Sequence, residues 1–100
     1  MSYTRIWRFQ AATGRELEFT AAYGPEGDWA RLFRQSPGYL RTELARLDPA
    51  GDVFLITDRW ASRKDWDDFL VAHGDAYHQL DRAFAPLCAS ETELDEYEMP

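Results

Sequence analysis

Two ionisable side chains in this 100-residue chain lie among apolar residues, and each could move a proton. His73 follows Phe69 by four residues and Trp66 by seven, so a helix would place all three on one apolar face. Because an imidazole titrates near neutral pH, His73 is a candidate catalytic base. A hydrogen-bonded core histidine would produce the same pattern, so both interpretations remain open.

Asp58 is the second candidate, since it interrupts an otherwise apolar run and a buried carboxylate needs a partner. One partner is an arginine such as Arg41, Arg46 or Arg59, in an ion pair. The alternative is a catalytic role, in which Asp58 orients a histidine or a substrate hydroxyl.

Aromatic residues make up 15% of the chain, which suits either a large subunit interface or a ligand pocket lined by rings. Arginines expected on strands could stabilise an oxyanion, namely Arg5, Arg8 and Arg41. We therefore expect the substrate-binding side chains to be Trp7, Tyr39, Arg41, Trp66 and Tyr77. The aromatic members of this set would fit an ordinary core equally well.

The chain contains no recognisable motif for a metal or a cofactor. His73, Asp75 and His78 do not share the i, i+4 face that metal-binding helices use. A phosphate-cradling glycine loop, a Ser-His-Asp order and paired catalytic carboxylates are also missing from the sequence. We predict that any reaction proceeds without a metal or a bound cofactor.

The elements that would position these residues follow from periodicity and turn signals. We predict strands at Tyr3–Ala11, Tyr39–Leu47, Val53–Trp60 and Thr92–Glu98. Helical pieces are expected at Glu16–Tyr23, from Asp28 through Phe33, and from Ser62 to Ala85, with Ser62 as the N-cap and a kink near Gly74. In the second strand, alternation groups Tyr39 with Arg41 on one face and Leu40 with Thr42 on the other.

This order of elements predicts an α+β, ferredoxin-like βαββαβ fold, with a four-stranded antiparallel sheet in one domain spanning residues 1–100. A turn from Asp48 to Asp52 would pair the second and third strands antiparallel. The last strand is acidic, so we expect it at an edge of the sheet or crossing to a partner subunit.

Charge and cysteine content limit the classes of partner. Acidic residues outnumber basic ones by 18 to 11, giving a net charge of −7 that disfavours nucleic acid. The single Cys88 cannot form an internal disulfide, which fits a reducing compartment. We see no apolar signal region and no run of membrane-spanning length. The expected location is the cytoplasm, without a membrane partner.

Two helices cover only one face of a four-stranded sheet, and the open face would carry large apolar side chains. Depending on register, these are Trp7 and Phe9 or Ile6 on the first strand, and Phe54 and Ile56 or Leu55 on the third. Such a surface favours association, so we predict a symmetric homodimer that packs the open faces together.

Four stretches resemble the antibiotic biosynthesis monooxygenase family: Ala21–Pro25, Asp28–Phe33, Pro37–Leu40 and Thr57–Ser62. With the helix that carries Phe69 and Tyr77, the resemblance covers most of the chain. It implies a dimeric α+β barrel and cofactor-independent oxygenation, in which a small aromatic, polyketide or quinol substrate is deprotonated and its anion reacts with oxygen.

Two alternatives remain. One is a non-catalytic module that binds a small aromatic molecule or takes part in a stress response on the same scaffold. The other is haem degradation, which the family performs with an Asn in the first strand, a Trp in the second helix and a later His. Here the first strand has no Asn, and Phe69 and Gln79 stand at the Trp and His positions.

Overall fold

The apolar strand β3, Val53–Trp60, lies inside a four-stranded antiparallel sheet. The computed structural model describes residues 1–49 and 51–100. The sheet has the order β2-β3-β1-β4, with β2 at Tyr39–Arg46, β1 at Ser2–Ala11 and β4 at Cys88–Met99. The predicted antiparallel pairing of the second and third strands is confirmed. Residue 50, in the predicted turn between them, lies outside the described residues.

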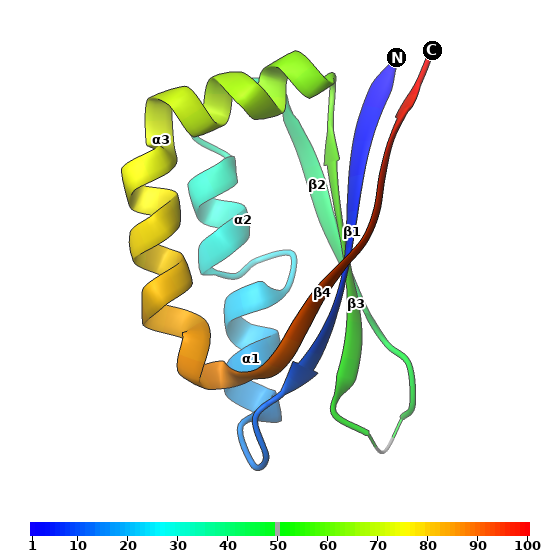
Figure 1. Cartoon of the computed structure of the whole chain (residues 1–100), viewed down its shortest axis with the longest axis vertical. Helices are drawn as coiled ribbons and strands as arrows, with labels where there is room; N and C mark the ends of the chain where they lie inside the picture. The colour runs from blue at the N-terminus through cyan, green and yellow to red at the C-terminus, as the bar shows by residue number, and fades with distance from the viewer. Residues whose placement is uncertain (50) are drawn as a thin grey trace.

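The helices all lie on one side of the sheet (Figure 1). They are α1 at Glu16–Tyr23, α2 at Asp28–Phe33 and α3 at Arg63–Phe84, and a 3-10 turn, η1, follows at Ala85–Leu87. This arrangement confirms the predicted ferredoxin-like fold. β4 is an edge strand, as predicted, but it begins at Cys88, because the chain passes from η1 directly into pairing with Ala11.

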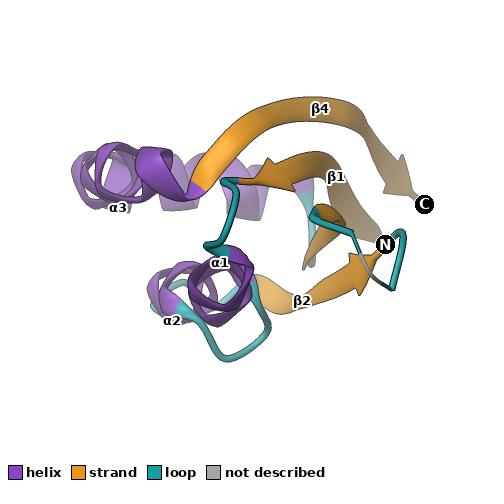
Figure 2. Ribbon diagram, turned by 90° about the horizontal axis from the view of Figure 1, so that it is seen from below, coloured by secondary structure: helices purple, strands orange, loops and turns teal. Residues whose placement is uncertain are grey.

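Strand register decides which apolar residues the helices cover. Phe54 and Ile56 of β3 are buried on the inner face, opposite Phe9 and Trp7 of β1. Leu55, on the uncovered outer face, is only partly buried. Figure 2 shows the sheet curving, with β4 arching beside β1. The inner face of this curved sheet and the helices enclose the aromatic core.

The helix α3 begins where its N-cap was predicted. The Ser62 Oγ accepts a hydrogen bond of 3.1 Å from the Asp65 amide, which satisfies an N–H in the first turn. The predicted kink falls at His73, beside Gly74, where φ is −129° and ψ is 19°. The bend turns the second half of α3 down along the sheet (Figure 1). No helix in the described part of the chain is long and apolar enough to cross a membrane.

A bulge in β2 overturns the predicted alternation of that strand. Tyr39 is opposite Trp60 and Arg41 is opposite Arg59, so Leu40 is an extra residue in the ladder. The bulge moves Tyr39 to the inner face, where Thr42 also lies, and turns Arg41 outward. The expectation that Tyr39 and Arg41 share a face was therefore wrong.

Candidate active site

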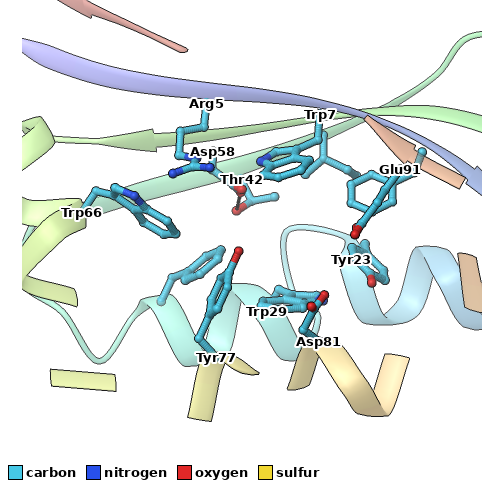
Figure 3. Close-up of a pocket in the computed structure, with 13 residues that line it drawn as sticks. Arg5, Trp7, Tyr23, Trp29, Thr42, Asp58, Trp66, Tyr77, Asp81 and Glu91 are labelled. Carbon is cyan, nitrogen blue, oxygen red and sulfur yellow. Dashed lines mark hydrogen bonds between the residues drawn. The ribbon is translucent and has the colours of Figure 1, made fainter. Parts of the chain in front are cut away.

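The inner face of the sheet and the helices enclose a cavity of about 150 Å³. Aromatic rings from β1 and the three helices form most of its wall, namely Trp7, Phe9, Tyr23, Trp29, Phe33, Trp66 and Tyr77 (Figure 3). Cavities of about 150 Å³ with apolar walls hold benzene in other proteins. The enclosed space is therefore large enough for one aromatic ring, and its wall is chemically suited to one.

Asp58 places a carboxylate in this cavity. Its residue is 8% exposed, and burial raises the pKa of the carboxyl from 3.8 to about 6. A hydrogen bond of 2.7 Å from the Thr42 hydroxyl and the nearby charge of Arg5 both oppose that rise. A carboxylate with this pKa is a better base than an ordinary surface aspartate, yet it stays ionised at neutral pH.

Arg5 brings a positive charge to the same end of the cavity. Its guanidinium carbon lies 4.3 Å from the ring centroid of Trp66 and 5.5 Å from that of Trp7, so the group is held by cation–π contacts. One terminal nitrogen donates a hydrogen bond of 2.6 Å to Glu93 on β4. The Arg5 Nε is buried and has no acceptor among the described residues. Arg5 therefore places a guanidinium charge in the cavity wall beside Asp58, its cross-strand partner.

Trp7, Trp66 and Tyr77, three of the expected substrate-binding residues, do line the cavity. Burial raises the pKa of Tyr77 to about 12, so its hydroxyl stays protonated at neutral pH. Trp66 is stacked on Phe69 with 5.6 Å between ring centroids, which fixes its ring beside Arg5.

Tyr39 and Arg41 do not line the cavity, and the bulge in β2 explains both positions. The Arg41 side chain is 61% exposed on the outer face and lies 3.8 Å from Glu43. Tyr39 is on the inner face but reaches only Thr42, by a hydrogen bond of 2.7 Å between the two hydroxyls. Tyr39 is therefore linked to Asp58 through Thr42 and does not border the cavity itself.

The two histidines also lie outside the cavity lining. His73 occupies the kink of α3 with its ring 5.5 Å from that of Phe69, and His78 lies five residues beyond it on the same helix. The structure thus does not bring His73 and Asp58 into one cavity. His73 keeps the expected i, i+4 contact with Phe69, but Phe69 itself does not line the cavity, so a position on its face does not bring the histidine there. No cluster of potential metal ligands occurs among the described residues.

Two further carboxylates, Asp81 on α3 and Glu91 on β4, border the end of the cavity away from Arg5 (Figure 3). Burial, and then the negative charge of Asp81, raise the pKa of Glu91. The cavity is therefore polarised, with a guanidinium at one end and two carboxylates at the other.

Sequence reasoning did not assign Thr42 or the two carboxylates at the cavity end to the site, and it named Arg5 only as one of several strand arginines. Arg5 could have been placed, because strand alternation already put it on the face of Trp7. Thr42 could not have been placed in the site from the sequence, since only the bulge puts it on one face with Tyr39. Asp81 and Glu91 meet through the bend of α3 and the curvature of β4, neither of which has a local sequence signal.

Comparison with known proteins supports the predicted family. The profile described as antibiotic biosynthesis monooxygenase matches residues 2–79. A similar solved structure is SnoaB, a cofactor-independent oxygenase from Streptomyces nogalater, with a TM-score of 0.77 at 18% identity, over 99% of this chain and 93% of that one. A putative antibiotic biosynthesis monooxygenase from Deinococcus radiodurans gives 0.74 at 19% identity, over 100% and 93%.

A third similar structure is a point mutant of MhuD with two manganese protoporphyrin IX molecules bound per active site. Its TM-score is 0.70 at 21% identity, over 97% of this chain and 93% of that one. The curated proteins contain no match to the chain. At these identities, the structural likenesses establish the shared fold.

Proposed function

This chain belongs to the antibiotic biosynthesis monooxygenase family, and we propose that it oxidises a small phenol or hydroquinone with molecular oxygen and without a cofactor. One observation carries the proposal: Asp58 and Arg5, partners on neighbouring strands, both line one aromatic cavity. The likeness to SnoaB adds to it, because that protein is a cofactor-independent oxygenase on the same fold.

The reaction begins with a proton transfer. Asp58 takes the proton of the substrate hydroxyl, and the electron pair of the O–H bond remains on the substrate oxygen as an anion. Arg5 stabilises that anion through the positive charge of its guanidinium. Because Asp58 is buried and aromatic rings line the cavity, this electrostatic stabilisation is stronger than it would be in solution.

The anion then supplies electrons to oxygen. For a phenol whose ring system carries an oxidisable methylene, the CH₂ group becomes a carbonyl that contains one oxygen atom of O₂. The second oxygen atom leaves as water with the two methylene hydrogens. This substrate provides all four electrons, so the balance requires no external reductant. A hydroquinone instead gives two electrons and two protons to O₂, which leaves as hydrogen peroxide while the quinone forms. The protein has to bind, deprotonate and hold the substrate.

Haem degradation is a second activity that the likeness to MhuD brings into consideration. Neither histidine lines the cavity, so the cavity wall offers no imidazole for a haem iron. The proposed phenol oxidation uses groups that do line the cavity, which favours it over haem degradation. A haem titration monitored at the Soret band distinguishes them, and a saturable band with haem breakdown would contradict our choice.

We also infer a homodimer formed through the outer face of the sheet. Leu55 of β3 lies on that face with no helix over it, and Leu94 and Tyr97 of β4 are exposed. Burying such side chains in an interface removes apolar area from water. Multi-angle light scattering should give twice the 11.6 kDa chain mass, and a stable monomer at micromolar concentration would contradict the inference.

The function is tested by oxygen uptake with a panel of anthrones and hydroquinones, using purified protein treated with a chelator and free of added flavin. The expected result is saturable uptake above the spontaneous rate, with one O₂ consumed per anthrone oxidised to the quinone. Binding of the same aromatics in thermal-shift experiments without any product would instead support the non-catalytic alternative.

A further inference from the structure

A hydrogen-bonded series of three polar side chains, Asp58, Thr42 and Tyr39, runs from the cavity wall to the start of β2. Thr42 and Asp58 are cross-strand partners on β2 and β3, and the Thr42 hydroxyl donates to Asp58 Oδ1 at 2.7 Å. The Tyr39 hydroxyl lies 2.7 Å from the same Thr42 oxygen. This series of hydrogen bonds exists because the bulge at Leu40 turns Tyr39 to the face of Thr42.

The direction of these hydrogen bonds follows from the number of hydrogens available. An ionised Asp58 can only accept, and Thr42 has a single hydroxyl hydrogen, which points to Asp58. Tyr39 must therefore donate to Thr42. Both hydrogens then point toward the cavity, an arrangement that stabilises negative charge on Asp58.

The surrounding aromatic rings hold these hydrogen-bonded side chains in place. The ring of Tyr39 lies 5.6 Å from that of Phe33 and 5.4 Å from that of Trp60, so its hydroxyl has little freedom. Thr42 is 4% exposed. Asp58 Oδ1 is thus occupied, whereas Oδ2 has no hydrogen-bond partner among the described residues and belongs to a side chain that lines the cavity.

We propose that Thr42 and Tyr39 are positioning residues that keep Asp58 ionised and turn its second carboxylate oxygen toward the substrate. The proposal rests on the function given above, in which Asp58 is the base. It gives Tyr39, which does not border the cavity, a role through Thr42.

The other groups that face Asp58 do not replace the hydrogen bonds from Tyr39 and Thr42. From β1, Arg5 supplies positive charge without an ion pair to Asp58, since its acceptor is Glu93. From α3, Tyr77 carries a hydroxyl whose proton is retained at neutral pH, and Trp66 is uncharged. From α2, Trp29 and Phe33 contribute uncharged rings. Among these groups, Thr42 is the one that donates a hydrogen bond to the Asp58 carboxylate.

The test is the pKa of Asp58, measured without substrate by ¹³C NMR of labelled aspartate carboxyls, with Asp58→Asn to assign the resonance. Thr42→Val keeps the shape of the side chain and removes the donor, so the pKa should rise by about one unit, a tenfold change in the acid dissociation constant. Thr42→Ser retains the hydroxyl and should restore most of the wild-type value.

Tyr39→Phe retains the ring and should raise the pKa of Asp58 by less than Thr42→Val does. In the Thr42→Val background it should have no further effect, because the link to Asp58 is already broken. An unchanged pKa in Thr42→Val, or an equal effect of Tyr39→Phe in both backgrounds, would overturn the proposal. Should Thr42→Val fail to fold, Tyr39→Phe alone decides, and an unchanged pKa would then overturn it.

The NMR measurement separates this proposal from the function on which it rests. A shifted pKa in a protein that never consumes oxygen would keep the positioning role and remove the oxygenase function. Oxygen uptake with an unshifted pKa would keep the function and remove the positioning role.

Discussion

Arg5 and Asp58 are register partners on β1 and β3, and both side chains line the same aromatic cavity. No ion pair joins them in the described structure, because the Arg5 guanidinium lies over the Trp66 ring and pairs with Glu93. A base and a cation therefore lie side by side in the cavity wall.

Replacing Asp58 with Asn should stabilise the fold at neutral pH. In the folded state burial raises the pKa of Asp58 from 3.8 to about 6, so the unfolded chain loses this proton first. The native state then binds more protons between these values, and stability falls as pH rises through them. At 1.36 kcal/mol per unit, the cost to the wild-type protein above pH 6 is about 3 kcal/mol.

Urea unfolding of wild type and Asp58→Asn at several pH values measures this effect. The variant should be more stable by up to about 3 kcal/mol near pH 8, and the two should converge near pH 4. Other carboxylates titrate equally in both proteins, so the difference isolates Asp58. Equal stabilities near pH 8 would show that Asp58 carries no burial cost.

Substituting Arg5 by Met should weaken catalysis by roughly 100-fold in kcat/KM, because the positive charge that stabilises the substrate anion is lost from the cavity wall. Arg8→Met is the matched control, since Arg8 is exposed on the same strand. Steady-state oxygen uptake by the two variants measures the difference. An equal loss of kcat/KM in Arg5→Met and Arg8→Met would show that Arg5 has no part in the mechanism.

The carboxylates Asp81 and Glu91 should make the site prefer positively charged ligands to negatively charged ones. Neither has an ion pair within 4 Å among the described residues, and both border the cavity. Phenols of equal size that carry an ammonium, a neutral or a carboxylate substituent should bind in that order, with roughly tenfold between the extremes.

Calorimetric titration of these phenols measures the preference. It should disappear in the double variant Asp81→Asn, Glu91→Gln and persist in Asp75→Asn, an exposed position on α3 that does not line the cavity. A preference that is unchanged in the double variant would assign it to the overall negative charge of the protein.

The fold could be predicted from the sequence because its signals are local. The alternating apolar run before Trp60, the Ser62 cap and the glycine near the kink each specify an element without reference to the rest of the chain. The position of Asp58 in the cavity wall also follows from local pattern, since it alternates with Ile56 and Trp60 on one face of β3.

The remainder of the site depends on departures from ideal geometry. One extra residue, Leu40, puts Tyr39 and Arg41 on opposite faces, and the bend of α3 at His73 brings Asp81 to the end of the cavity. Neither departure changes the composition or the apolar pattern. Side chains on either side of a bulge or a kink cannot be assigned to a face until its position is known.

Asp58 is the residue on which the whole account depends, and oxygen uptake by Asp58→Asn with an anthrone or hydroquinone substrate tests it most directly. We predict that kcat/KM of the wild-type protein rises with pH through a single ionisation near 6, as the pKa of Asp58 requires. The variant should lose roughly 100-fold to 10,000-fold in kcat/KM while it still binds the substrate. A variant with wild-type activity and the same pH profile would contradict the account.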